Sequence, residues 1–194
     1  ALRYECSGTT GQVRVGTDSG LTSQGSSAVA IGNSAGNSGQ LGSAVAVGVN
    51  AGQTTQGGSA VAIGSNAGFS GQGGSAVAVG NTAGQTTQGT NAVAVGINAG
   101  FSGQGMSAVA VGNTAGRTTQ GSNAVAIGFN SGNSSQGGSA VAIGNTAGAT
   151  TQGTNAVAIG VNAGNSGQLA DAVAVGNSAG RTTQGTSAVA VGNT

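Results

Sequence analysis

The sequence predicts an all-β fold, a parallel β-solenoid or β-roll in which each turn of the chain stacks on the turn before it. Three observations predict it: a 16-residue unit that recurs with almost no interruption, a strict alternation of apolar residues inside every unit, and glycine-rich steps at fixed places between them. Self-similarity at a short fixed period indicates a repeat architecture. An alternation with period two is typical of strands, and Gly-Asn, Ala-Gly and Gln-Gly steps are typical of turns.

The repeats divide the chain into two predicted parts. Residues 1–10 do not fit the pattern, and we expect them to form an N-terminal cap or pre-repeat segment. Residues 11–194 are predicted to form a solenoid of eleven 16-residue repeats plus a half repeat. The half repeat at 187–194 suggests that the natural protein continues or that this end docks on another molecule. The first residues of the regular units are Ser27, Ser43, Ser59, Ser75, Asn91, Ser107, Asn123, Ser139, Asn155, Asp171 and Ser187.

Numbering each unit from its first residue shows which positions are fixed. In the regular units, positions 2 and 4 are Ala, position 3 is Val, position 5 is Val or Ile, and position 6 is Gly. Positions 10 and 14 are Gly and Gln in all eleven full units. We predict that the Val and Val/Ile side chains form two apolar rows inside the roll. The alanines of positions 2 and 4, beginning with Ala28 and Ala30, would then form a flat outer strip suited to contact with another copy.

A second period, twice as long as the first, overlies it. From about Ser59 onward, units of a Ser-Gly type (Phe69-Ser70-Gly71-Gln72) alternate with units of a Thr-Thr type (Gln85-Thr86-Thr87-Gln88). One coil could therefore be either a single 16-residue unit or a 32-residue pair of units. We favour the single unit, because each one repeats the same apolar strand. The rival interpretation, a disordered or elastomeric Gly-rich chain, does not explain the fixed Gln at position 14.

The composition excludes several classes of function. The net charge is +1 and only 4% of residues are charged, so no field attracts nucleic acid. With no histidine and with Glu5, Asp18 and Asp171 isolated, we predict that the chain is not an enzyme and has neither a cofactor nor a metal site. No apolar run is long enough for direct membrane insertion. Cys6 is the only cysteine, so no disulfide can form within the chain.

Two sets of residues are candidates for contacts with other molecules. The first set interrupts the polar rows with apolar side chains and forms candidate interchain or ligand-contact rows: Val49, Ile97, Phe129 and Val161 at position 7, and Phe69 and Phe101 at position 11. The second set is a candidate surface row made by the Thr-Thr steps: Thr54, Thr55, Thr86, Thr87, Thr118, Thr119, Thr150, Thr151, Thr182 and Thr183.

The units SAVAIGNSAG, NAVAIGVNAG and SAVAVGNTAG resemble the head repeats of trimeric autotransporter adhesins of the YadA-like type, over about residues 11–194. The units here are longer than those of that family, and the extra residues lie in the Gln-Gly turn. The pattern AVAIGxNAGxxxQG is also similar to repeats in fibres of large viruses and phages. The resemblance implies a left-handed β-roll, a homotrimer, and an extracellular location on a cell or virion surface.

The leading functional hypothesis is a non-enzymatic structural or adhesive fibre module, a rigid rod that presents a repetitive polar surface. Such a rod would associate with its own copies and could bind a host-surface receptor or glycan. The alternative is an ice-binding, or antifreeze, β-solenoid, because low charge and flat rows of Ala, Thr and Ser suit a surface that orders water. Against it, we expect adjacent Thr residues to point to opposite faces of a strand, and the Thr-Thr steps occur only in alternate units.

Overall fold

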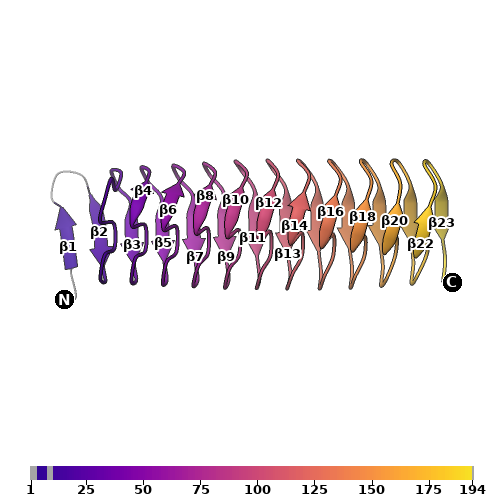
Figure 1. Cartoon of the computed structure of the whole chain (residues 1–194), viewed down its shortest axis with the longest axis horizontal. Coiled ribbons are helices and arrows are strands. Elements are labelled where there is room, and N and C mark those ends of the chain that lie inside the picture. The colour runs from indigo at the N-terminus through magenta and orange to yellow at the C-terminus, as the bar shows by residue number, and fades with distance from the viewer. Residues whose placement is uncertain (1–3, 8–10, 194) are drawn as a thin grey trace.

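The computed structural model describes residues 4–7 and 11–193, which form a straight rod of stacked coils with the chain termini at opposite ends (Figure 1). Each coil is one repeat unit, because every strand pairs with the strand one unit later: Val93 with Val109, and Gln88 with Gln104. The predicted all-β parallel solenoid with a 16-residue coil is therefore confirmed, and the 32-residue coil is not. Eleven coils at the strand spacing of about 4.8 Å give a rod of about 50 Å.

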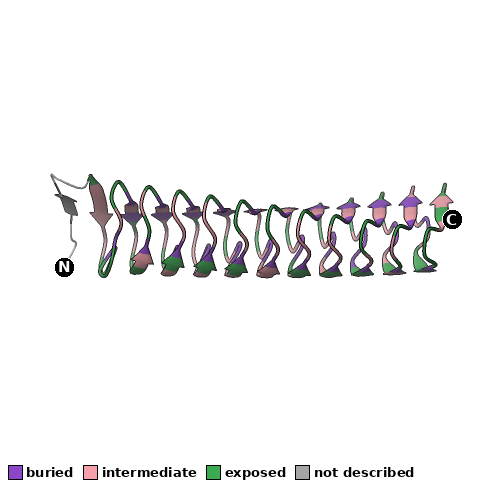
Figure 2. Ribbon diagram, turned by 90° about the horizontal axis from the view of Figure 1, so that it is seen from above, coloured by how far each residue is buried: buried purple, intermediate pink, exposed green. Residues whose placement is uncertain are grey.

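Two sheets run the length of the rod on opposite sides of each coil (Figure 2). Positions 3–5 of each unit build a 13-stranded sheet, which we call the valine sheet. Its strands are β1 (Tyr4–Ser7), β2 (Gln12–Val15), β3 (Val29–Ile31), β5 (Val45–Val47), β7 (Val61–Ile63), β9 (Val77–Val79), β11 (Val93–Val95), β13 (Val109–Val111), β15 (Val125–Ile127), β17 (Val141–Ile143), β19 (Val157–Ile159), β21 (Val173–Val175) and β23 (Val189–Val191).

Positions 12–14 build a 10-stranded sheet, which we call the glutamine sheet. An isolated bridge between Thr22 and Ser38 extends it to the first coil. All pairings in both sheets are parallel except that of β1 with β2. The strands are β4 (Ser38–Gln40), β6 (Thr54–Gln56), β8 (Ser70–Gln72), β10 (Thr86–Gln88), β12 (Ser102–Gln104), β14 (Thr118–Gln120), β16 (Ser134–Gln136), β18 (Thr150–Gln152), β20 (Ser166–Gln168) and β22 (Thr182–Gln184).

The core between the sheets is built from alanine, and this corrects the predicted orientation of the valine strands. The alanines of positions 2, 4 and 9, such as Ala28, Ala30 and Ala35, are fully buried, and Figure 2 shows buried segments recurring in every coil. The branched residues point outward instead: Val29 is half-buried and Ile31 is 37% exposed. A coil this narrow has room for methyl groups between its sheets, and larger branched side chains face the outside.

One glutamine per coil spans the interior and satisfies backbone groups there. The Nε2 atom of Gln88 donates to the carbonyl oxygen of Val77 at 2.7 Å and to that of Ala92 at 3.3 Å. The same pair of bonds recurs at position 14 of every full unit, from Gln24 to Gln184. Because buried carbonyl groups need partners, the fixed glutamine is a structural residue that ties the valine sheet to the following turn.

Two glycine positions are required by the close approach of neighbouring groups. Gly80, at position 6, has φ 133°, and a β-carbon there would lie 2.5 Å from the carbonyl oxygen of Gly96 in the next coil. Gly84, at position 10, has φ 52°, and a β-carbon there would lie 2.6 Å from the Oε1 atom of Gln88. Only a residue without a side chain fits either place, which explains why these positions do not vary.

The first coil replaces the alanine core with polar residues. Gln12, Arg14 and Ser19 occupy positions 2, 4 and 9. Arg14 Nε donates to Gln24 Oε1 at 2.5 Å, and Arg14 Nη2 donates to Gln12 Oε1 at 3.1 Å. Strand β1 pairs antiparallel with β2 and covers its outer edge, with Cys6 opposite Val13. The rest of the predicted cap, residues 1–3 and 8–10, lies outside the described residues.

Candidate binding surfaces

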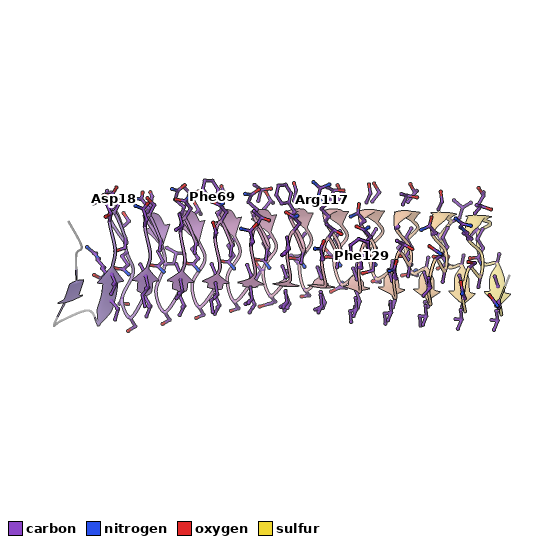
Figure 3. The ribbon with its side chains drawn as sticks, turned by 90° about the horizontal axis from the view of Figure 1, so that it is seen from below. Asp18, Phe69, Arg117 and Phe129 are labelled. Carbon is purple, nitrogen blue, oxygen red and sulfur yellow. The ribbon has the colours of Figure 1, made fainter. Side chains whose placement is uncertain are left out.

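The outer face of the valine sheet is a flat aliphatic surface, which we call the valine face. It consists of the residues of positions 3 and 5 from β3 to β23. Because the alanine between them is buried, both side chains of each strand point away from the core. The isoleucines of position 5 are 36–40% exposed. Parallel pairing places equivalent residues side by side along the rod, and Figure 3 shows side chains projecting from this sheet.

Four of the six apolar contact candidates lie at position 7, two residues beyond the end of a valine-sheet strand. Their side chains are 47–51% exposed. From Ile97 onward they occupy every second coil, and the coils between them carry Asn. They therefore lie next to the valine face and extend its apolar surface on one edge. The four residues are Val49, Ile97, Phe129 and Val161.

The other two candidates, Phe69 and Phe101, lie at position 11, next to the first strand residue of the glutamine sheet. Both are half-buried. The guanidinium carbon of Arg117, in the coil after Phe101, lies 5.5 Å from the centre of the Phe101 ring, the geometry of a cation–π contact. Figure 3 places Phe69 and Arg117 along one margin of the rod and Phe129 away from it. The six candidates thus form two separate rows.

The outer side of the glutamine sheet carries hydroxyl groups. Position 12 is Ser or Thr in every full unit, and Thr86 Oγ1 donates to the carbonyl oxygen of Phe101 at 3.3 Å. At position 13, Thr alternates with Gly over most of the rod. The φ values of Thr55, Thr87, Thr119 and Thr151 lie between 49° and 54°.

The predicted orientation of the Thr-Thr steps is therefore wrong. Alternation between opposite faces assumes an extended backbone at both residues, whereas the second Thr is in the left-handed region. As a result neither residue of a pair is buried: Thr86 is half-buried and Thr87 is exposed, and both Thr150 and Thr151 are exposed. None of the ten threonines is buried, and all of them lie on the outer side of the glutamine sheet.

The surfaces offer contacts and no grouped reactive side chains. Among the described side chains of residues 11–193, no three His, Cys, Asp or Glu residues come together in a way that could hold a metal ion. No cavity opens in the described coils. Asp171 accepts a hydrogen bond from Asn155 Nδ2 at 3.0 Å, within the row of position 1. The same part of the chain contains no helix that is long and apolar enough to cross a membrane.

No protein-family model, curated protein or solved structure matches this chain. The resemblance to adhesin heads and to viral fibres therefore stays a prediction. Arg117 and Gln85 were not predicted as site residues. They became candidates only when the 16-residue coil placed them in one row with Phe69 and Phe101.

Proposed function

We propose that the chain is a non-enzymatic structural and adhesive rod that associates through its valine face into a homotrimer. The proposal includes a left-handed coil and an extracellular position on a cell or virion surface, as in the fibres that its units resemble. The observation that carries it is the aliphatic face itself. Two uncharged rows of Val and Ile run along the whole solenoid on its outside.

The size of this face favours a partner. Two rows of side chains along about 50 Å of rod cover about 500 Å² by strand geometry. Apolar patches of several hundred Å² on soluble proteins mark interaction sites. The exposed position-7 residues enlarge the patch on one side. No charged residue stands at positions 3 or 5 from β3 to β23, so nothing on the face opposes contact with a second copy.

The face also changes the predicted mode of association. The alanine strip cannot be the contact, because Ala28, Ala30 and their equivalents as far as Ala174 are fully buried inside the coils. Covering the remaining exposed part of one Val or Ile contributes about 0.5–1 kcal/mol, a fraction of full burial. Many such residues in register make the association specific for another straight rod with the same repeat.

Light scattering after size exclusion tests the proposal. We expect a mass of three chains for the natural sequence. Val93→Glu together with Val109→Glu places two charges in the middle of the face, and we expect a mass of one chain with an unchanged far-UV circular dichroism spectrum. Gln85→Glu, on the other side of the rod, is the matched control and should remain trimeric. A natural chain that is monomeric at all concentrations contradicts the proposal.

The second candidate function is ice binding, and one observation favours it. The valine face is a flat array with side chains at the strand spacing, and such an array could order water if it were uncovered. Its ice-contacting residues would be Val and Ile, since the alanines of the earlier expectation are buried. Thermal hysteresis of the purified chain at millimolar concentration tests it. A trimer without thermal hysteresis rules it out.

A further inference from the structure

The outer surface of the rod has a longer period than its core. Core positions 2, 4 and 14 repeat in every unit. Outward position 13 alternates between Gly and Thr over most of the rod, as at Gly71, Thr87, Gly103 and Thr119, with Ser135 in place of Gly in one unit. Two coils correspond to about 10 Å along the rod. Folding requires only the 16-residue period of the core. We therefore attribute the 32-residue period to the surface that the rod presents to other molecules.

Position 11 carries Phe in two coils that are two units apart, with polar side chains between and after them. Four successive coils carry Phe69, Gln85, Phe101 and Arg117, hence an aromatic ring, an amide, a second ring and a guanidinium group. In the glutamine sheet, the strands that follow these residues pair in order, β8 with β10, β10 with β12 and β12 with β14. Consecutive members of the row therefore lie one coil apart, about 4.8 Å.

We propose that this row binds an extended β-1,4-linked pyranose chain lying parallel to the rod axis. The inference deepens the adhesive part of the proposed function and rests on it. A pyranose ring has an apolar C–H face that packs on aromatic rings, and its hydroxyl groups pair with amide and guanidinium donors. The row alternates these two kinds of group along one straight line.

The lengths of the row and of the sugar chain agree. In its extended two-fold form, a β-1,4 chain advances by about one coil per sugar and presents the same ring face at every second sugar. Phe69 and Phe101 are two coils apart and would contact alternate sugars. Gln85 would contact the sugar between the two rings, and Arg117 would contact the sugar that follows the one on Phe101. A tetrasaccharide therefore spans the row.

The neighbouring groups can complete the contacts. Thr86 and Thr118 at position 12 donate their hydroxyl hydrogens to the carbonyl oxygens of Phe101 and Asn133, at 3.3 and 3.2 Å. Their oxygen lone pairs stay available to accept from sugar hydroxyls. The Arg117 guanidinium lies over the Phe101 ring, 5.5 Å from its centre, so a sugar would pack on the part of that ring that Arg117 leaves open.

The same geometry disfavours other ligands. The row is flat and open at both ends, since no cavity forms in the described coils, and this suits the interior of a polymer. An α-1,4 glucan curves and would leave a straight row after a few sugars. The row lies on the glutamine-sheet side, opposite the valine face, so it remains accessible in the proposed trimer.

Isothermal titration of the full chain with cellohexaose, chitohexaose and maltohexaose tests the proposal. We expect binding of at least one of the two β-1,4 hexaoses, and comparing them tells whether the ligand is a glucose or an N-acetylglucosamine polymer. Maltohexaose should not bind. Cellobiose or chitobiose, too short to reach both rings, should bind at least about tenfold more weakly than the matching hexaose, because it loses one of two anchors.

Substitutions connect the binding to the row. Phe69→Ala and Phe101→Ala should each weaken hexaose binding by about tenfold or more, as loss of an aromatic anchor does. Phe129→Ala is the matched control: its side chain is 51% exposed but lies in the position-7 row, and we expect unchanged affinity. An equal loss in Phe129→Ala would show general apolar adhesion and overturn the inference.

The results that would overturn the sugar-binding inference differ from those that would overturn the proposed trimer. If neither β-1,4 hexaose binds with a dissociation constant below the millimolar range, or if maltohexaose binds equally well, the inference is wrong. The mass from light scattering still decides on trimerisation in that case. Phe69→Ala and Phe101→Ala should keep the trimeric mass, since both residues lie on the glutamine-sheet side and leave the valine face intact.

Discussion

The Oε1 atom of Gln88 lies 2.6 Å from the point at which a β-carbon on Gly84 would be placed. The side chain of the buried glutamine fills the space that a β-carbon on the glycine four residues before it would need. The glutamine fits there because the glycine has no side chain. The same relation holds between Gly36 and Gln40 and between Gly180 and Gln184. The interior therefore depends on a pair of residues in each coil, and substitution of either member should be costly.

Gly84→Ala tests the glycine of this pair. The alanine would require φ near 52° and would meet both Gln88 Oε1 and the β-carbon of Ala78, the latter at 3.2 Å. We expect the free energy of unfolding to fall by about 2 kcal/mol or more, from strain and overpacking together. Gly71→Ala is the control, because φ is 70° there but the nearest atom is 3.6 Å away. Guanidinium titration measures both, and equal losses would contradict the clash.

Gln88→Ala tests the glutamine. It removes the donor to the carbonyl oxygens of Val77 and Ala92 and leaves a void in the core. We expect a loss of about 2–5 kcal/mol in the free energy of unfolding, from unsatisfied groups and a cavity. Gln85→Ala removes a half-buried glutamine from the outer surface and should change stability by less than about 0.5 kcal/mol. If the two variants were equally stable, the interior glutamine would have no structural role.

Ala94→Val tests which face of the valine sheet is inside. Ala94 is fully buried, and two added methyl groups should lower the free energy of unfolding by about 1–3 kcal/mol through overpacking. Ala170→Val is the control, since Ala170 is half-buried at position 16, where other units carry Thr or Met. It should be close to neutral. A neutral Ala94→Val would mean that the alanines face outward after all.

Arg14→Ala tests the polar first coil. The change leaves Gln24 Oε1 and Gln12 Oε1 without the guanidinium donor. Local fraying should follow, so amide hydrogen exchange should accelerate in β2 and β3 and stay unchanged in β11, at the centre of the rod. Arg181→Ala removes an exposed arginine at position 11 and should not change exchange in β2 or β3. Uniform acceleration along the whole rod would show that Arg14 has no local role.

The repeat period could be predicted from the sequence, and the direction of its side chains could not. Alternation at positions 2 to 5 showed that Ala and Val face opposite sides of the strand, but it does not show which of the two sides faces the core. The assumption that branched residues are buried failed because the coil is narrow. A usable signal was present: position 5 accepts both Val and Ile, whereas positions 2 and 4 of the regular units accept only Ala. An interior of fixed volume tolerates no such exchange.

Only the two phenylalanines of the position-11 row could be predicted from the sequence, and Gln85 and Arg117 could not. Phe69 and Phe101 stood out by their spacing of two units, but their separation from Phe129 required the course of the turn between positions 7 and 11. The threonine steps were misjudged for a local reason. Thr87 has φ 52°, which a rule based on strand geometry does not anticipate for a β-branched residue.

The register of the strands, one unit to the next without slippage, has a consequence for how such a chain can change. Removing one whole unit would bring the neighbours on either side into the contacts they already make, so the rod would shorten by one step and keep both faces aligned. Removing 15 residues instead of 16 would leave one extra residue in a single coil, which would have to bulge out or disturb the strand pairing at that junction. Length is therefore a quantity that duplication or loss of complete units can adjust, independently of what the surface binds.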